Sequence, residues 1–132
     1  MHDHPFADLI GLRTDSREAG TSEMSLAVSP SHLNPHGVVH GAVLYALADT
    51  GMGAALYPSL AAGESCATIE IKISYYRPVL AGRVLCRTEV LNRGRTIANL
   101  ESRLYVEGRL VAQANGNYAI LAPRPAAGSG KP

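Results

Sequence analysis

One carboxylate interrupts the most apolar stretch of this 132-residue sequence. In the segment NPHGVVHGAVLYALADTGMGAAL, residues 34–56, nearly every side chain after Val38 is small or apolar, yet Asp49 lies in its middle. Burying an ionised carboxylate without a partner costs free energy. No Lys or Arg lies within four positions of Asp49, so no ion pair forms along its own helix face. We therefore interpret Asp49 as a candidate functional carboxylate, beside two structural alternatives, a buried salt bridge or a side chain that faces water.

His40 and Gly41 mark a second chemical feature of this segment, the expected start of a helix over 39–60. Backbone N–H groups in the first turn have no partner within the helix, and the helix dipole favours negative charge there. The Gly41 amide is thus able to stabilise an oxyanion, and glycine lets a substrate approach the backbone closely. On the residues alone, a purely structural role for Gly41, starting or packing the helix, is the simpler interpretation.

The spacing of Gly41 and Asp49 limits where a reaction centre can form. Eight positions separate them, which is about 12 Å along a helix. A single carbonyl carbon cannot lie within ~3 Å of both groups. If both act on one substrate, they come from two subunits, with antiparallel helices placed across a two-fold axis. Under that condition, the spacing favours active sites that are shared between the two subunits of a homodimer.

A single α+β domain is expected to position these residues. The segment 39–60 is apolar almost all round, which is typical of a helix buried on most sides. We expect one long buried helix wrapped by a curved antiparallel sheet of five or six strands, in a domain over 1–122 with a disordered tail at 123–132. In the strand after the helix, the odd-numbered residues are expected to form the apolar face, with Thr68 on the polar face. The other expected elements are a helix or turn at 3–12, strands at 21–29, 67–75, 83–91, 96–106 and 110–121, and a tight hairpin turn at 107–109.

Composition excludes several other classes of protein. A formal net charge of +1 gives no electrostatic case for a protein that binds nucleic acid or acidic surfaces. The two cysteines, Cys66 and Cys86, form no CxxC pair or Cys/His cluster, so no metal site is expected. The first residues have no signal-peptide pattern, and the polar residues His40 and Asp49 argue against a membrane-spanning helix. A reduced, cytoplasmic protein is expected.

The order of these motifs resembles a known family. The opening segment combines His-Gly at the helix start with Leu-Ala-Asp about two turns later. Further matches are TIEIKISYYRPVLAG (68–82), LNRGRTIANLES (91–102) and EGRLVAQANGNYAIL (107–121). Together they resemble the PaaI-like branch of the hotdog-fold acyl-CoA thioesterases, in the 4-hydroxybenzoyl-CoA thioesterase superfamily. One departure is Ala42, where the common pattern has a second glycine after the histidine.

The resemblance implies roles for five residues in thioester hydrolysis. Asp49 is expected to be the general base that activates water, or the nucleophile itself. The Gly41 amide is expected to form the oxyanion hole from the other subunit. Asn34 positions the carbonyl or the water, or only forms the Asn-Pro turn, and His40 bonds the thioester carbonyl or supports the loop. Thr68 is expected to orient the attacking water, with an ordinary strand residue as the alternative.

Four residues are candidates for binding coenzyme A, whose nucleotide end carries phosphates. The segment NRGR offers Arg93 and Arg95 on either side of Gly94, in a turn whose N–H groups are expected to be exposed. Arg77, before a proline, is a further candidate. Solvated surface arginines are the alternative at each position. No cofactor is expected, because coenzyme A is part of the substrate.

The expected function is hydrolysis of an aryl- or medium-chain acyl-CoA to the free acid and coenzyme A. The resemblance also implies that the homodimers pair into a homotetramer, and that the protein takes part in the degradation of phenylacetate or other aromatic compounds. Three alternatives remain: a non-catalytic acyl-CoA-binding domain, an enoyl-CoA hydratase or dehydratase, and a structural oligomerisation domain. The hydratases use an acidic residue paired with His, and no such pair falls in the expected helix–loop pattern.

Overall fold

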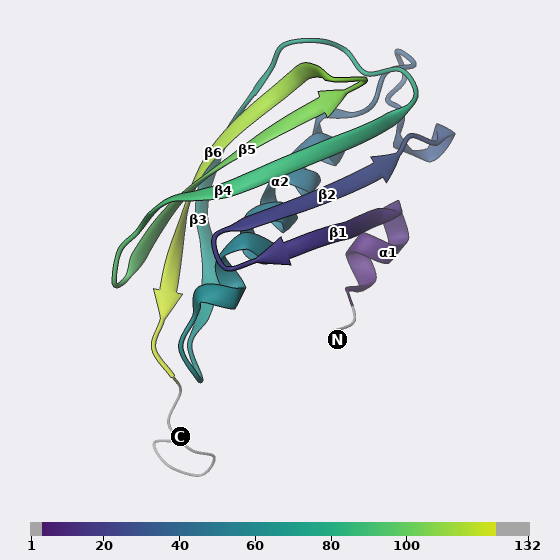
Figure 1. Ribbon diagram of the computed structural model, residues 1–132. Helices are drawn as coiled ribbons and strands as arrows, with labels where there is room; N and C mark the ends of the chain where they lie inside the picture. The colour runs from purple at the N-terminus through teal and green to yellow at the C-terminus, as the bar shows by residue number, and fades with distance from the viewer. Residues whose placement is uncertain (1–3, 124–132) are drawn as a thin grey trace.

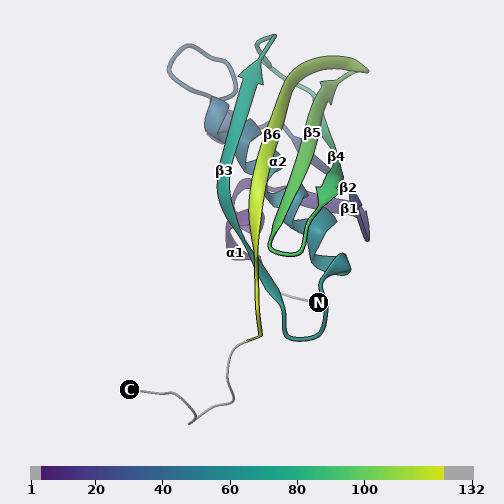
Figure 2. The ribbon, with the colours of Figure 1, turned by 90° about the vertical axis from the view of Figure 1, so that its left-hand side faces the viewer.

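A six-stranded antiparallel sheet curves around one long helix in the computed structural model, which describes residues 4–123 (Figure 1). The predicted architecture is therefore confirmed, while the tail predicted at 123–132 lies, from residue 124 onward, outside the described residues. The strands lie in the order β1-β2-β4-β5-β6-β3, so that β1 and β3 form the edges, and α2 lies behind the sheet in Figure 2. The helices are α1 (Pro5–Ile10) and α2 (Gly41–Leu56), with 3-10 turns η1 (Pro30–His32) and η2 (Tyr57–Ser59). The strands are β1 (Leu12–Glu18), β2 (Thr21–Ala27), β3 (Ser65–Tyr75), β4 (Arg83–Arg93), β5 (Ile97–Val106) and β6 (Arg109–Leu121).

Helix α2 is shorter than the segment 39–60 predicted from its apolar residues. It begins at Gly41, because His40 has an extended backbone and its side chain caps the first turn. It ends at Leu56, because Pro58 cannot donate a helical hydrogen bond, and the chain continues as η2. No helix among residues 4–123 is long and apolar enough to cross a membrane. The buried residues of α2 are Leu44, Ala46, Leu47, Ala48, Gly51, Met52, Ala55 and Leu56, and the remaining strip of the helix carries Asp49.

Strand β1 is an element that the sequence pattern does not predict. The helix or turn expected at 3–12 is observed as α1, which ends at Gly11 in a left-handed conformation. β1 follows at once, but only Leu12 of its seven residues is buried, because the strand lies at an edge of the sheet. A strand with one buried residue shows no alternating apolar pattern. The next strand, predicted at 21–29, is confirmed as β2.

A β-bulge in β3 reverses part of the predicted sheet face. The pairing of β3 with β6 shifts register between Thr68 and Glu70, and a bulge turns the residues beyond it to the other face. Ile69, predicted on the apolar face, is 53% exposed, whereas Thr68, predicted on the polar face, hydrogen-bonds α2. Beyond the bulge, Ile71 packs against the core as predicted. The single alternating face predicted for this strand is therefore wrong at its start.

The last three strands are confirmed with small changes of bounds. The segments predicted at 83–91, 96–106 and 110–121 are observed as β4, β5 and β6. Between β5 and β6, Glu107 and Gly108 both have positive φ, as a two-residue hairpin turn requires. The predicted hairpin turn is therefore confirmed.

A group of buried hydroxyls joins the sheet to α2 close to Asp49. Ser22 donates to the Gly51 carbonyl at 2.7 Å, and Ser102 donates to a carbonyl about one turn earlier in the helix at 3.3 Å. Thr88 lies 2.6 Å from the Ser102 hydroxyl. Because these groups bond the helix on both sides of Asp49 along the chain, they fix α2 against the sheet and hold Asp49 in place.

Replacing Gly51 by Ala is expected to destabilise the protein. An added Cβ would lie 2.7 Å from the Thr88 hydroxyl, and overpacking of this kind costs about 1–3 kcal/mol. The cost exceeds the roughly 1 kcal/mol that alanine gains over glycine inside a helix. Denaturant titration measures the fall in the free energy of unfolding. With Thr88→Ala added, the loss should be smaller than the sum of the two single losses, and an additive result would contradict a clash at this contact.

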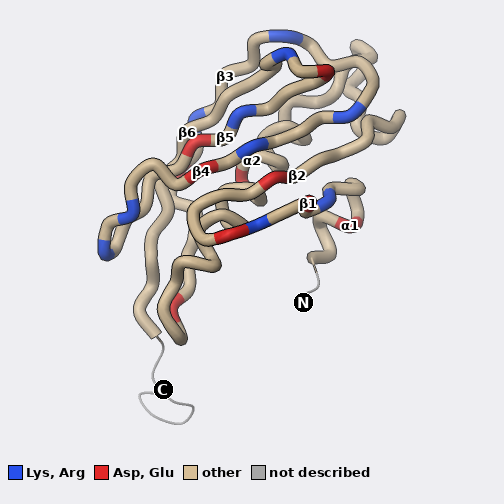
Figure 3. Tube along the Cα trace, in the orientation of Figure 1, with Lys and Arg blue, Asp and Glu red and all other residues tan. Residues whose placement is uncertain are grey.

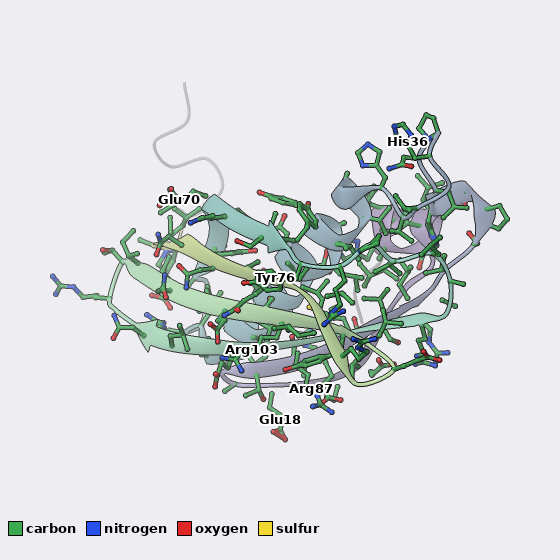
Figure 4. The ribbon with its side chains drawn as sticks, turned by 90° about the horizontal axis from the view of Figure 1, so that it is seen from above. Glu18, His36, Glu70, Tyr76, Arg87 and Arg103 are labelled. Atoms are coloured by element: carbon green, nitrogen blue, oxygen red, sulfur yellow. The ribbon has the colours of Figure 1, made fainter. Side chains whose placement is uncertain are left out.

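Charged residues of both signs are spread along the strands of the sheet (Figure 3). Acidic and basic residues are interspersed over β2, β4 and β5 (Figure 3), and Arg87 pairs with Glu23 at 3.1 Å. Glu18 and Arg87 project from this face, away from α2 (Figure 4). Both signs of charge therefore occur along these three strands, in agreement with the small net charge.

Candidate active site

Asp49 lies on the open strip of α2, where two hydroxyl groups hold its carboxylate. Thr68 donates to Asp49 Oδ1 at 2.8 Å. Tyr118 donates to the same oxygen, and its hydroxyl also lies 2.7 Å from the Asp49 carbonyl. Within residues 4–123 no donor is bound to Oδ2. The carboxylate is therefore fixed through one oxygen, and its other oxygen is free beside the cavity that Asp49 lines.

The register of the sheet brings Thr68 and Tyr118 to the same point. They are direct partners in the antiparallel pairing of β3 with β6, and the side chains of such partners project from the same face. Burial, and then the hydrogen bond to Asp49, raises the pKa of Tyr118 far above its ordinary value. Tyr118 therefore stays protonated and acts as a hydrogen-bond donor to the carboxylate.

Tyr118 is a site residue that the sequence pattern did not identify. The buried residues of β6 alternate along the strand from Ala112 through Ala114 and Gly116 to Tyr118. Tyr118 is the member of this series with a polar side-chain group, and a buried tyrosine hydroxyl usually has a hydrogen-bond partner. A tyrosine within this series of small residues is therefore the feature of the sequence from which a site residue on β6 is predictable. The identity of the partner follows from the packing of β6 against α2 and β3, which the sequence pattern does not define.

A cavity of about 530 Å³ opens beside Asp49. Thr50 and Gly53 of α2 line it, together with residues of β3 and β6. Cys66 also lines it, and burial followed by the nearby Asp49 carboxylate raises the pKa of this thiol. The thiol is therefore held in its protonated, weakly nucleophilic form. A cavity of this size accommodates a small-molecule ligand, and Asp49 is the reactive group that faces it.

The start of α2 lines a second cavity, of about 340 Å³. Gly41 lies on it, and its N–H has no backbone acceptor among the described residues. An added Cβ at Gly41 would lie 2.9 Å from the Tyr75 hydroxyl, which itself donates to the Gly41 carbonyl at 2.8 Å. The glycine therefore permits close packing of Tyr75 and leaves a backbone donor accessible at the positive end of the helix.

Asp49 and Gly41 lie on different cavities within one chain. Asp49 lines the larger cavity and Gly41 the smaller one. Helix α2 runs without interruption between them, so that about 12 Å of helix separates the two residues. A single chain therefore does not bring together the residues predicted as base and as oxyanion hole.

Asn34 and His40 both make structural contacts around the start of α2. Asn34 Oδ1 accepts from the backbone N–H of His36 at 2.8 Å and of Val38 at 3.4 Å, which closes an Asx-type turn. His40 Nδ1 accepts from the Ala42 N–H at 2.9 Å and caps the helix. In the neutral ring this leaves the proton on Nε2. The Asn34 amide N–H₂ and the His40 Nε2–H are therefore donors that these contacts do not use.

The four residues predicted to bind coenzyme A do not form one group. Arg77 lines the cavity at the start of α2. Arg93 reaches the chain that follows α2, where it pairs with Glu64 at 3.4 Å. The Gly94 N–H donates to a backbone carbonyl across its turn at 2.8 Å, because the two backbone segments approach closely there. The prediction of an exposed N–H at Gly94 for phosphate is therefore wrong, while Arg95 is exposed.

Comparison with known proteins identifies the class to which this chain belongs. Residues 36–113, more than half of the chain, match the family model of the thioesterase superfamily. The chain therefore belongs to the thioesterase superfamily.

Individual known proteins are similar to this chain over most of their length. Proofreading thioesterase EntH of Klebsiella pneumoniae subsp. pneumoniae is 29% identical over 113 residues, which are 85% of this chain and 82% of that protein. The structure of conserved protein PA5202 from Pseudomonas aeruginosa is 34% identical, with a TM-score of 0.86 over 90% of this chain and 95% of the other. A mutant of the phenylacetic acid degradation protein PaaI from Thermus thermophilus is 31% identical, with a TM-score of 0.82 over 88% and 98% of the two chains.

The comparisons confirm the PaaI-like hotdog thioesterase family that the motif order predicts. The fold, one long helix packed on a curved antiparallel sheet of six strands, is the hotdog fold. The chain is a thioester hydrolase, and its family acts on acyl-CoA and typically forms oligomers.

Proposed function

We propose that this protein hydrolyses the thioester of an aryl- or medium-chain acyl-CoA, with Asp49 as the group that activates water. The observation that carries the proposal is the Asp49 carboxylate, with one oxygen held by Thr68 and Tyr118 and the other free beside a cavity. Oδ2 takes a proton from water as the water oxygen attacks the thioester carbonyl carbon. The tetrahedral intermediate then loses the coenzyme A thiolate, which gains that proton, and the free acid remains.

The Gly41 N–H of a second subunit stabilises the oxyanion in this proposal. Two antiparallel copies of α2 across a two-fold axis bring the Asp49 of each subunit close to the helix start of the other. The separation of the two residues along one helix, and their positions on different cavities, support this arrangement. The proposed assembly is a homodimer with two shared sites, and two dimers pair to form the tetramer.

Four further predicted residues act around these two groups. Thr68 orients the water through Asp49, because its hydroxyl is bonded to the carboxylate. The unused donors of Asn34 and His40 position the thioester carbonyl next to the Gly41 amide. Arg77 lines the same cavity as Gly41 and binds phosphate groups of coenzyme A.

Release of free thiol from a panel of acyl-CoAs tests the proposed function. Phenylacetyl-, 4-hydroxybenzoyl-, hexanoyl- and octanoyl-CoA cover the two proposed acyl classes, and acetyl-CoA is the short-chain reference. At least one aryl or medium-chain member should be hydrolysed with kcat/KM of about 10⁴ M⁻¹s⁻¹ or more. Tight binding of the panel without any thiol release would replace the hydrolase with a non-catalytic acyl-CoA-binding protein.

Replacing Tyr118 by Phe is expected to lower kcat by about tenfold to a hundredfold, with KM within about threefold of wild type. The variant keeps the buried ring and loses the hydroxyl that fixes Asp49 Oδ1, and hydrogen bonds to a charged group are stronger than neutral ones. Steady-state kinetics on the best substrate measure both constants. Tyr105→Phe, on the outer face beside Arg87, is the matched control and should leave kcat unchanged. An unchanged kcat in Tyr118→Phe would contradict the positioning role.

A further inference from the structure

The cavity at Asp49 has a second wall that hydrolysis itself does not require. This wall is formed by α1 and β1, whereas Asp49 lies near β3 and β6. β1 and β3 are the opposite edges of the sheet, so the cavity reaches across α2 from one edge of the sheet to the other. The residues of the second wall are His4, Phe6, Thr14 and Arg17.

Arg17 lies on the side of β1 that faces α2. It is the direct partner of Ser22 in the antiparallel pairing of β1 with β2, and paired residues project from the same face. Ser22 donates to the Gly51 carbonyl of α2, which places this face toward the helix. Glu18, the next residue along β1, projects from the outer face (Figure 4). The Arg17 guanidinium is therefore directed to the cavity side.

The charges on the cavity are separated rather than paired. Asp49 is the carboxylate and Arg17 the guanidinium among the described lining residues, and none of the ion pairs formed within residues 4–123 includes Arg17. His4 Nδ1 accepts from the Ala7 N–H at 3.2 Å, so the neutral ring carries its proton on Nε2 as a further donor. The α1–β1 wall thus offers hydrogen-bond donors and positive charge, opposite a wall that holds a negative one.

We propose that the α1–β1 wall binds a carboxylate at the far end of the acyl chain, so that the preferred substrates are CoA monothioesters of medium-chain dicarboxylic acids. This inference rests on the proposed function, because it assigns the larger cavity to the acyl group. Arg17 matches a carboxylate through two parallel hydrogen bonds. The Asp49 carboxylate repels the terminal carboxylate of the acyl chain but not its uncharged thioester. The charges of the two walls therefore favour binding with the thioester beside Asp49 and the carboxylate beside Arg17.

Matched pairs of substrates test this proposal. Wild-type protein should hydrolyse adipyl-CoA with a kcat/KM at least about tenfold above that for hexanoyl-CoA, which has the same chain length without the second carboxylate. In Arg17→Met the value for adipyl-CoA should fall about tenfold or more, while that for hexanoyl-CoA stays within about twofold. Arg17→Lys should recover part of the loss. Arg13→Met, on the outer side of the same strand, is the control and should change neither value.

The phosphates of coenzyme A are a second kind of anionic group that an arginine binds. A shorter thiol carrier without phosphate distinguishes them from the carboxylate of the acyl chain. Adipyl and hexanoyl thioesters of N-acetylcysteamine lack phosphate, and the loss in Arg17→Met should persist on the adipyl compound alone. Equal losses on adipyl-CoA and hexanoyl-CoA that disappear with the short carrier would assign Arg17 to coenzyme A and overturn the proposal. Equal wild-type rates on the two CoA thioesters would also overturn it. If neither CoA thioester is hydrolysed while an aryl-CoA is, the proposed function stands and the dicarboxylate proposal is overturned. If no acyl-CoA is hydrolysed, the proposed function fails, and calorimetric binding of the two thioesters still decides whether Arg17 selects the carboxylate.

Discussion

The Asp49→Asn variant is expected to lose between about 10²-fold and 10⁴-fold in kcat on every acyl-CoA that the wild-type protein hydrolyses. The amide has nearly the shape of the carboxylate. Its nitrogen takes the position of Oδ2 and cannot accept a proton from water. Thr68 and Tyr118 are still able to donate to the remaining carbonyl oxygen, so the variant should fold and bind substrate. Steady-state kinetics with detection of free thiol measure the loss.

Two measurements separate a loss of chemistry from a loss of structure. The Tm of Asp49→Asn should stay within about 4 °C of wild type, which corresponds to a change of roughly 1 kcal/mol. Asp15→Asn is the matched control. The Asp15 carboxylate pairs with Arg83 at a distance of 3.5 Å, and neither residue lines the cavity at Asp49. This variant should not change kcat. If Asp49→Asn kept a kcat close to wild type, Asp49 would be excluded both as base and as nucleophile.

Isotope labelling shows a nucleophilic role of Asp49 if the label is found in Asp49, whereas label in the acid alone fits direct attack by water and also an anhydride opened at the acyl carbon. In a single turnover in oxygen-18 water, a general base directs the label into the released acid, because water attacks the thioester carbonyl directly. A nucleophile first forms an anhydride between Asp49 and the acyl group. Water attack on the Asp49 carbon of that anhydride leaves the label in Asp49, where peptide mass spectrometry detects it. We expect the label in the acid, as the proposed water attack requires.

The chemically important residues of this chain are easier to predict than the contacts that support them. Asp49 and Gly41 are recognised locally, the first as a carboxylate within an apolar helix and the second as a glycine at a helix start. The hold on Asp49 comes from Thr68 and Tyr118, which are 50 residues apart in sequence and meet through the register of two strands. A one-residue bulge decides that Thr68 faces the helix. Alternation of residue types along one strand carries no information about that bulge.

The incorrect predictions share a physical cause, the influence of neighbouring chain on a local pattern. β1 lacks an apolar face because it is an edge strand with only Leu12 buried, so its residues do not distinguish it from a loop. The Gly94 N–H is occupied because the backbone at Ile97 folds back onto it, although the residue types are those of an open turn. The end of α2 depends on how the chain passes Pro58 into η2. In each case residue type defines the chemistry available, and tertiary contacts define whether it is used.

Mixing two inactive variants is expected to restore about a quarter of wild-type activity. Asp49→Asn subunits lack the base. Gly41→Val subunits carry a branched side chain beside the backbone N–H of residue 41, where even a single added Cβ would lie 2.9 Å from the Tyr75 hydroxyl. Each variant alone should lose about a hundredfold or more. In a random mixture of equal amounts, about half of the dimers contain one subunit of each kind, and one of their two sites has both residues intact.

The double variant, with Gly41→Val and Asp49→Asn in one subunit, gives the opposite expectation and so tests the shared site independently. When it is mixed with an equal amount of wild type, every site of a mixed dimer takes one residue from the double variant and is inactive. Only the all-wild-type dimers, about a quarter of the total, should contribute. Sites contained within single subunits would instead leave about half of the activity. Co-expression of differently tagged subunits, with native mass spectrometry to count the mixed dimers, provides both measurements.

A result near one half in the second mixture, with no recovery in the first, would place the whole reaction centre in one chain. The roughly 12 Å of helix between Gly41 and Asp49 would then exclude the Gly41 amide as the oxyanion hole for a carbonyl attacked at Asp49. A result near one quarter in both mixtures requires that the two residues reach one substrate from different subunits. The length of helix α2 between its first residue and its one carboxylate would then be the feature that makes this hydrolase active only as an assembly.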